Sequence, residues 1–240
     1  MTELLYREDA YARTCQAKVI GVTERGGIVL DRTVFYAMAG GQPGDKGILD
    51  VHTFEPIQIV TTVKDENGHI VHVPLENSPE PDIGQSVTAS LDWAARHRHM
   101  RIHTAMHLVC SLVPYPVTGG QIGAEGGRLD FDIPEAGAVT REDLELNLNR
   151  LIAENHPVSE RWITDEELAA NPGLVRTMSV KPPTGTGKVR LVMIGEDGKI
   201  DLQPCGGTHV KETREIGLVS VGRIESKGRQ NKRIRISLLS

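Results

Sequence analysis

The sequence has few aromatic residues, few cysteines and no long apolar run. Aromatic side chains make up 4% of the 240 residues, so a folded core must be mostly aliphatic. The three cysteines, Cys15, Cys110 and Cys205, are odd in number and widely spaced, which argues against a disulfide scaffold and for a reducing, cytoplasmic setting. No apolar run reaches the length that spans a bilayer, and the first residues lack the apolar centre of a signal peptide.

An excess of positive charge is absent as well. The formal net charge of −5 excludes a globally basic nucleic-acid binder, although a local basic face is compatible with it. A hydrophobic content of 39% and a charged content of 25% are those of an ordinary globular protein, long enough for one large domain or two modest ones.

The first 90 residues predict a domain made of strands. Short apolar segments recur between polar or glycine-containing turns, of which 24–27 and 66–68 have hairpin chemistry. The expected strands are residues 17–22, 28–30, 47–51, 57–63, 69–75 and 86–91. Because no convincing helix separates them, we expect a small antiparallel β-barrel over residues 1–90.

One loop in this region, residues 35–47, is rich in glycine. Four glycines in eight positions allow a loop to approach a ligand or another backbone closely. An irregular turn between two strands accounts for the same pattern. The segment is a poor match to a phosphate-binding fingerprint, because no helix follows it.

The character of the sequence changes at Asp92, which can cap a helix that ends near Val113, before Pro114. Apolar residues mingle with histidines along this helix, so we expect it to be largely buried. The segments expected after it are a glycine-rich loop at 118–127, helices opening at Thr140 and Thr164, and strands at 128–133, 188–194, 199–202, 217–224 and 233–239. We therefore expect an α+β domain over residues 91–240.

Two motifs that lie far apart in the chain together predict a metal site. His103 and His107 are one helical turn apart, so both imidazoles leave the same face. Cys205 and His209 belong to a glycine-rich loop. Three imidazoles and one thiolate suit a single zinc ion.

Two roles for the ion stay open. A closed set of four protein ligands is typical of structural zinc, whereas catalytic zinc keeps a position for water or substrate. A zinc ion that promotes hydrolysis would need one weakly bound ligand or a wider coordination, or would mainly position the substrate.

These motifs resemble the editing domain of alanyl-tRNA synthetase and its free-standing relatives, the AlaX alanyl-tRNA editing proteins. The resemblance is carried, in chain order, by the loop 35–45, by His103-Thr104-Ala105-Met106-His107 and by Cys205-Gly206-Gly207-Thr208-His209. Asp92 and Arg96 also fit the pattern, while Ala39 replaces the serine expected before the glycine pair. The resemblance covers both halves of the chain and is closest to the medium-length class, a barrel followed by an editing domain.

The resemblance implies a zinc-binding editing domain of the threonyl/alanyl-tRNA synthetase type after the barrel. It also implies an enzyme of the cytoplasm that hydrolyses the ester between serine, or glycine, and alanine tRNA, without a nucleotide cofactor. The family places a polar residue, here Gln121, near the aminoacyl group. Thr208, next to a ligand, is a second candidate for catalysis, either donating to substrate or capping the loop.

Residues expected to contact tRNA or substrate lie in the first glycine-rich loop, at the basic start of the helix and near the C-terminus. They are Gly40, Gly41, Gln42, Arg96, Arg98, His99, Arg101, Lys227, Arg229, Lys232 and Arg233. Six Lys or Arg stand against one acid in residues 223–235, a pattern that also fits a solvated hairpin rim.

Two rival functions share these features. One is editing of another mischarged tRNA, such as seryl-tRNA(Thr), because threonyl-tRNA synthetase has a related domain with a similar ligand pattern. The other is a non-catalytic, zinc-stabilised RNA-binding module. Turnover of seryl-, glycyl-, alanyl- and threonyl-tRNA discriminates among the three.

Overall fold

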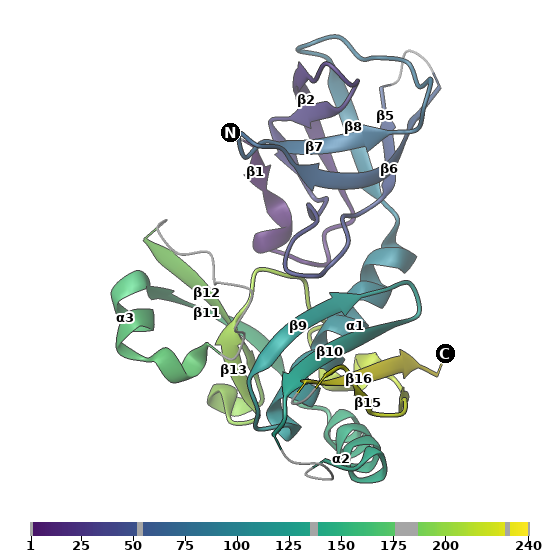
Figure 1. The fold of residues 1–240 in the computed structure, drawn as a ribbon. Helices are drawn as coiled ribbons and strands as arrows, with labels where there is room; N and C mark the ends of the chain where they lie inside the picture. Colours follow the sequence, from purple (N-terminus) through teal and green to yellow (C-terminus); the bar gives the residue numbers. More distant parts are fainter. Residues whose placement is uncertain (1, 52–54, 135–138, 176–186, 229–230, 240) are drawn as a thin grey trace. The chain divides into compact units, whose positions relative to one another are not determined.

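The computed structural model describes residues 2–51, 55–134, 139–175, 187–228 and 231–239 (Figure 1). Contacts between residues divide the chain into two compact units, 1–98 and 99–240, and the division falls inside helix α1 (Trp93–Leu112). No helix in the described ranges has the length and apolar character needed to cross a membrane. The fold is mixed α+β, as predicted; the boundary at residue 90 stays a prediction.

The first unit contains the expected antiparallel barrel. Its strands are β2 (Thr14–Val22), β3 (Ile28–Leu30), β5 (Gly47–Asp50), β6 (Ile57–Lys64), β7 (Ile70–Pro74) and β8 (Ser86–Leu91). They close in the order β2-β3-β7-β6-β5-β8. A short parallel pair, β1 (Glu3–Leu4) with β4 (Arg32–Thr33), accompanies them. Both predicted hairpins, β2–β3 and β6–β7, are confirmed.

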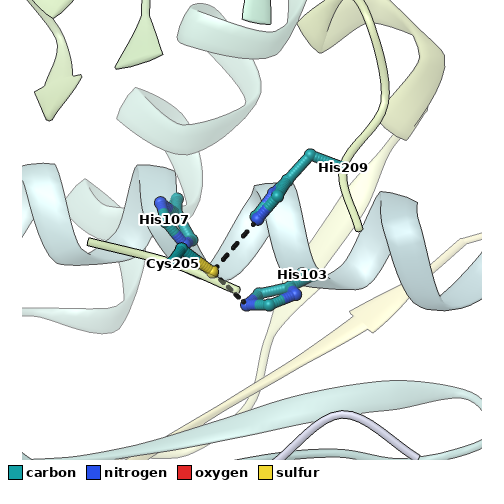
Figure 2. Close-up of side chains that lie close together, drawn as sticks. All are labelled: His103, His107, Cys205 and His209. Atoms are coloured by element: carbon teal, nitrogen blue, oxygen red, sulfur yellow. Dashed lines mark hydrogen bonds between the residues drawn. The ribbon is translucent and has the colours of Figure 1, made fainter. Parts of the chain in front are cut away.

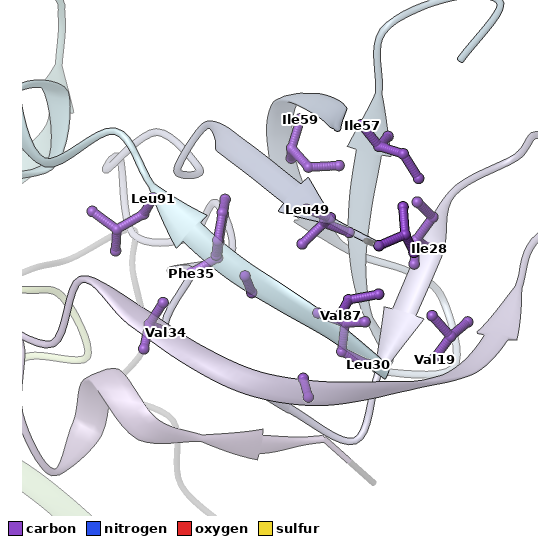
Figure 3. Close-up of a cluster of buried hydrophobic side chains, with 13 residues drawn as sticks. Val19, Ile28, Leu30, Val34, Phe35, Leu49, Ile57, Ile59, Val87 and Leu91 are labelled. Carbon is purple, nitrogen blue, oxygen red and sulfur yellow. The ribbon is translucent and has the colours of Figure 1, made fainter. Parts of the chain in front are cut away.

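Aliphatic side chains fill the barrel (Figure 3). Val87, Ala89 and Leu91 alternate along β8 and are all buried, so this face of the strand points into the barrel. Phe35 is the one aromatic residue of the buried cluster. Full burial of each large aliphatic side chain contributes about 1.5–3 kcal/mol.

Residues 35–46 of the glycine-rich segment form an irregular connection between β4 and β5, Gly47 begins β5, and the glycines permit close backbone approach. A Cβ at Gly44 would stand 1.9 Å from the carbonyl oxygen of Thr62, and one at Gly47 would stand 2.2 Å from that of Ser90. Any side chain at these two positions would collide with the barrel wall.

The second unit is built on two sheets. One has the strand order β14-β16-β10-β9, with β15 paired to β16, and the other has the order β11-β12-β13. The strands are β9 (Val117–Ile122), β10 (Gly126–Asp132), β11 (Val158–Thr164), β12 (Lys188–Ile194), β13 (Asp201–Pro204), β14 (Val219–Val221), β15 (Glu225–Ser226) and β16 (Asn231–Leu238).

Capped helices cover these sheets. Asp92 accepts a hydrogen bond from the Ala95 amide at the start of α1, as predicted. Thr140 caps α2 (Arg141–Ala153), and Thr164 forms a capping box with Glu167 at α3 (Asp165–Ala170). Residues 102–110 of α1 are all buried, which confirms the burial expected of this helix.

The glycine-rich loop predicted at 118–127 was wrong: these residues form β9, a short turn and the start of β10. The glycines serve close packing instead of a turn. A Cβ at Gly127 would stand 2.5 Å from Met106 Sδ on α1, and one at Gly126 would stand 2.1 Å from the Ile236 carbonyl oxygen on β16. Residues without side chains therefore let the β9–β10 hairpin lie against the helix and the next strand.

Strand β11 was missed. Four consecutive residues, 159–162, are exposed, so the strand has no clean apolar alternation. It lies at the edge of its sheet, where one face and one side contact solvent.

Candidate metal centre

The four predicted ligands converge on one point of the second unit (Figure 2). His103 and His107 leave the same face of α1, Cys205 follows β13 directly, and His209 lies four residues further along the same loop. One ligand atom from each residue lies within 4.8 Å of all the others.

The separations fit a tetrahedral ion. Cys205 Sγ lies 3.5 Å from His103 Nε2 and 3.3 Å from His209 Nε2. Zinc bonds of usual length to sulfur and nitrogen put two tetrahedral ligand atoms roughly 3.5 Å apart. The cluster can therefore hold a metal ion without rearrangement of these three residues.

A buried carboxylate orients His107. Its Nδ1 lies 2.8 Å from Asp201 Oδ2, which also accepts a hydrogen bond of 2.8 Å from the Gln203 amide. With Nδ1 donating to Asp201, Nε2 keeps its lone pair for a metal ion. Neither Asp201 nor Gln203 was predicted, because nothing in their local sequence distinguishes them from ordinary strand residues.

Thr104, which lies between His103 and His107 on α1, orients His209. The Thr104 hydroxyl donates to the Met100 carbonyl at 2.9 Å and lies 3.2 Å from His209 Nδ1. It also accepts from the Val210 amide at 3.3 Å. A residue of α1 that lies between two of the ligands therefore orients the ring of His209.

Arg190 on β12 holds the ligand loop. Its guanidinium donates to the carbonyl oxygens of Cys205 at 2.9 Å and Gly207 at 2.8 Å. Glu160 on β11 pairs with the same guanidinium, at 2.7 Å from Nε. The loop backbone is thus fixed by charged hydrogen bonds from a buried arginine.

Burial and neighbouring charges set the protonation of the cluster. Burial raises the pKa of the Cys205 thiol, but the imidazoles of His103 and His209 outweigh it and hold that pKa well below its usual value. Burial and the nearby His103 lower the pKa of His209. Thiolate and neutral imidazole are the forms that bind metal.

His107 behaves differently. Burial alone would lower the pKa of His107, but the hydrogen bonds that the ring donates to Asp201 and Cys205 outweigh it and raise that pKa to about 10. A metal ion that binds His107 must therefore displace a proton from it.

The two predicted catalytic residues lie in different settings. Thr208 is buried next to His209. Gln121 on β9 is exposed, and its Oε1 accepts from Arg128 Nε at 3.2 Å. Because Gln121 pairs with Arg128 across the strands, and Gly127 and Leu129 point to α1, Gln121 lies on the sheet face away from α1.

Arg96 does not offer a surface for RNA, contrary to its predicted setting. Its side chain is completely buried in the first unit and forms an ion pair with Asp45. The guanidinium also donates to Val34 O at 2.7 Å and Ala10 O at 2.9 Å. One of the basic residues at the start of the helix is therefore part of a buried ion pair.

The other basic residues at the start of α1 are more accessible. Arg98 is exposed, and His99 is half-buried. Arg101 is half-buried and donates to the Ile216 carbonyl at 2.9 Å. Of this group, Arg98 presents its charge most openly.

The basic segment near the C-terminus is partly neutralised. Arg233 donates to Asp130 at 2.7 and 2.8 Å, and its hydrogen bond holds the pKa of Asp130 below the usual range. Lys227 lies 2.9 Å from Glu225, and Lys232 donates to Ser226 at 2.9 Å. The predicted contact Arg229 lies outside the described residues.

The predicted substrate residues of the glycine-rich loop differ in exposure. Gly40 and Gly41 form its tip, with φ of 56° and 84°, and Gly40 is exposed. Gln42 is completely buried, and its backbone N–H donates to Ala39 O at 2.9 Å. Of these three predicted residues, the two tip glycines are accessible to solvent and Gln42 is not.

Comparison with known proteins agrees with this geometry. Residues 189–235 match the family described as threonyl and alanyl tRNA synthetase second additional domain, and residues 9–95 match class II (A) tRNA synthetases. The alanyl-tRNA editing protein AlaX-M of Methanosarcina acetivorans is 35% identical over the full length of both chains.

Longer proteins match over part of their length. AlaX-L of Pyrococcus horikoshii is 35% identical over 98% of this chain and 57% of its own. The alanine–tRNA ligase of Pyrobaculum arsenaticum is 33% identical over 93% of this chain and 25% of its own. With its barrel, its ligand cluster and a relative matched end to end, the chain belongs to the family of alanyl-tRNA editing proteins.

Proposed function

We propose that the protein hydrolyses the ester that joins serine, or glycine, to alanine tRNA, at a single zinc ion held by His103, His107, Cys205 and His209. The convergence of these four side chains on one point carries the proposal. The full-length relatives named for alanyl-tRNA editing support the choice of tRNA. Such substrates are made in the cytoplasm, where we expect the protein to act.

When bound, zinc would supply a Lewis acid for the ester carbonyl and a site that lowers the pKa of water. Asp201 holds the Nδ1 proton of His107, so that the lone pair of Nε2 points into the cluster. Thr104 does the same for His209, and Arg190 keeps the loop carbonyls turned away from the ligands. Preformed orientation of this kind removes a reorganisation cost from hydrolysis.

One side of the ligand loop leaves room for an ester. Gly206, next to Cys205, is exposed, and a Cβ there would meet no atom within 4 Å. Thr208, on the other side of Gly207, would hydrogen-bond the aminoacyl group. Gln121, on the sheet face away from α1, would act indirectly, through strand β9. Alanine would be spared because polar groups that pair with the serine hydroxyl would stay unpaired.

We assign tRNA contacts to Arg98, His99 and Arg101, to the C-terminal cations Lys227, Arg229, Lys232 and Arg233, and to the glycine tip of the first loop. Arg96 and Gln42 would act indirectly, by shaping the segments that make contact. Phosphate contacts of this kind weaken steeply with salt.

The test is release of the amino acid from seryl-, glycyl- and alanyl-tRNA(Ala) and from seryl-tRNA(Thr). We expect serine and glycine to be released from tRNA(Ala) and alanine to be spared. Preferred cleavage of seryl-tRNA(Thr) would favour the threonine rival. Tight binding of all four without turnover would favour a non-catalytic RNA-binding module. Thr208→Ala and Gln121→Ala proteins, assayed alongside, test the two assigned residues.

A further inference from the structure

The sheet β11-β12-β13 has one apolar face and one face that leads to the metal centre. Ile163, Val189 and Leu191 form the apolar face and pack with Leu168 of α3. Side chains alternate between the two faces of a sheet. The opposite face therefore carries Trp162 on β11 and Arg190 on β12, which are direct partners in the register.

This second face is continuous with the metal centre. Gln203 on β13 is the register partner of Val192, so its side chain lies on the same face as Arg190. It donates a hydrogen bond to Asp201, which lies beside His107. Arg190 binds the carbonyl oxygens of Cys205 and Gly207. The Cys205 amide in turn donates to the Arg190 carbonyl at 3.1 Å. Trp162, Arg190 and Cys205 thus form one row across the strands.

The row has the dimensions of a nucleoside. Trp162 and Cys205 are separated by two strand spacings, roughly 10 Å. Trp162 lies on the outer strand and is 46% exposed. In the described part of the chain it is the one exposed side chain among Phe, Tyr and Trp; the other exposed large apolar residues are aliphatic.

A positive charge stands on the same face. Lys188 is exposed and lies two residues before Arg190, so its side chain leaves the sheet on the side of Trp162. An exposed indole beside a lysine is the combination that binds a base and its phosphate.

We propose that Trp162 is the stacking platform for the 3′-terminal adenine of tRNA, with Lys188 beside the adjoining phosphate. The inference rests on the proposed function, because the reacting ester is attached to the ribose of that adenosine. An ester held at the cluster puts its own base within the length of one nucleoside, which is where Trp162 lies. Stacking contributes to binding of the nucleotide and not to the ester chemistry.

Steady-state deacylation of seryl-tRNA(Ala) tests the proposal. Trp162→Ala is expected to raise KM roughly 10- to 100-fold, the loss typical of one stacked base, with kcat within about twofold. Trp162→Phe keeps a ring and should stay within about threefold of the wild type. Leu146→Ala, which removes an apolar side chain on α2 that is 70% exposed against 46% for Trp162, is the control and should change nothing.

A direct reading avoids any effect on folding. The chain has two tryptophans, so Trp93→Phe leaves Trp162 as the sole indole, and adenosine monophosphate should quench its fluorescence in a saturable way. An unchanged KM for Trp162→Ala, or no quenching in Trp93→Phe, would overturn the proposal. A changed sedimentation of Trp162→Ala with an unchanged KM would overturn it too, by assigning this edge strand to a second copy of the chain. Wild-type protein inert towards seryl-tRNA(Ala) would instead reject the proposed function, and quenching would then report on the platform alone.

Discussion

The barrel unit and the metal-bearing unit both bury histidine, but they leave it with opposite chemistry. In the barrel, His72 uses both ring nitrogens: Nδ1 donates to Ile28 O at 3.0 Å, and Nε2 accepts from the Thr33 hydroxyl at 2.8 Å. In the second unit, His107 and His209 each use one nitrogen on Asp201 or Thr104 and direct the other at Cys205.

The difference shows what marks a site. Burial and hydrogen bonding occur in both units, so neither identifies function. The distinguishing feature is a buried histidine ring nitrogen that faces another candidate ligand atom, here the sulfur of Cys205. The same contrast applies to charge, since Arg96 is enclosed by Asp45 in the barrel, whereas Arg190 extends to a ligand loop.

The largest expected effect separates the two kinds of histidine. His103→Ala should reduce bound metal from one ion per chain to a trace and lower deacylation more than about 100-fold, because one ligand of four is lost. His72→Gln should keep the ion and the activity. Metal analysis of both purified proteins makes the measurement, and loss of the ion from the His72 variant would break the contrast.

Next in size is the buried ion pair of the barrel. Arg96→Met leaves the Asp45 carboxylate buried without its partner and should cost about 3–5 kcal/mol of unfolding free energy. Arg98→Met, two residues further along the same helix but exposed, should cost less than about 0.5 kcal/mol. Urea denaturation followed by circular dichroism compares them. An equal loss of unfolding free energy in the two variants would mean that the buried Arg96–Asp45 pair does not stabilise the barrel.

The pH dependence of the barrel follows from His72. Burial lowers the pKa of His72 to about 4 in the folded protein, so the unfolded chain binds a proton there first as pH falls below 6.5. Stability should therefore fall by about 1.4 kcal/mol per pH unit between about pH 6.5 and 4 from this group alone. Urea denaturation of the wild type and of His72→Gln across this pH range gives two unfolding free energies, and their difference isolates the contribution of His72. Parallel stability curves for the two proteins would contradict the assignment.

The smallest expected effect tests the role of the Asp201 carboxylate in the second unit. Asp201→Asn should weaken metal binding about 10- to 100-fold, because His107 loses the charge that orients and polarises it. Glu196→Gln, an exposed acid just before β13, is the control and should leave the affinity unchanged. Competition with a chromogenic chelator measures both. Equal affinities would remove Asp201 from the metal centre.

Local patterns in the sequence predicted most of the fold and the four ligands. Short apolar segments and turn chemistry located the barrel strands, and spacing on a helix located His103 and His107. Strand β9 and the first residues of β10 were missed because their glycines serve contacts with α1 and β16 that no local pattern records. Strand β11 was missed because an edge strand does not need alternation.

Local sequence patterns could not predict the residues that act through partners elsewhere in the chain. Asp201 and Arg190 matter because the fold brings them to ligands far away in the chain. Arg96 looked like part of a basic surface because its partner, Asp45, belongs to another segment of the barrel. Spacing identifies ligands on one element, and only the tertiary fold identifies the groups that orient them.

The central claim, deacylation that depends on the ion at this cluster, is tested most directly by metal removal and return. Serine release from seryl-tRNA(Ala) is measured after dialysis against a chelator and then during titration with zinc. We expect loss of turnover and its recovery at one ion per chain, with no recovery in His103→Ala. Undiminished turnover by the metal-free protein would contradict it.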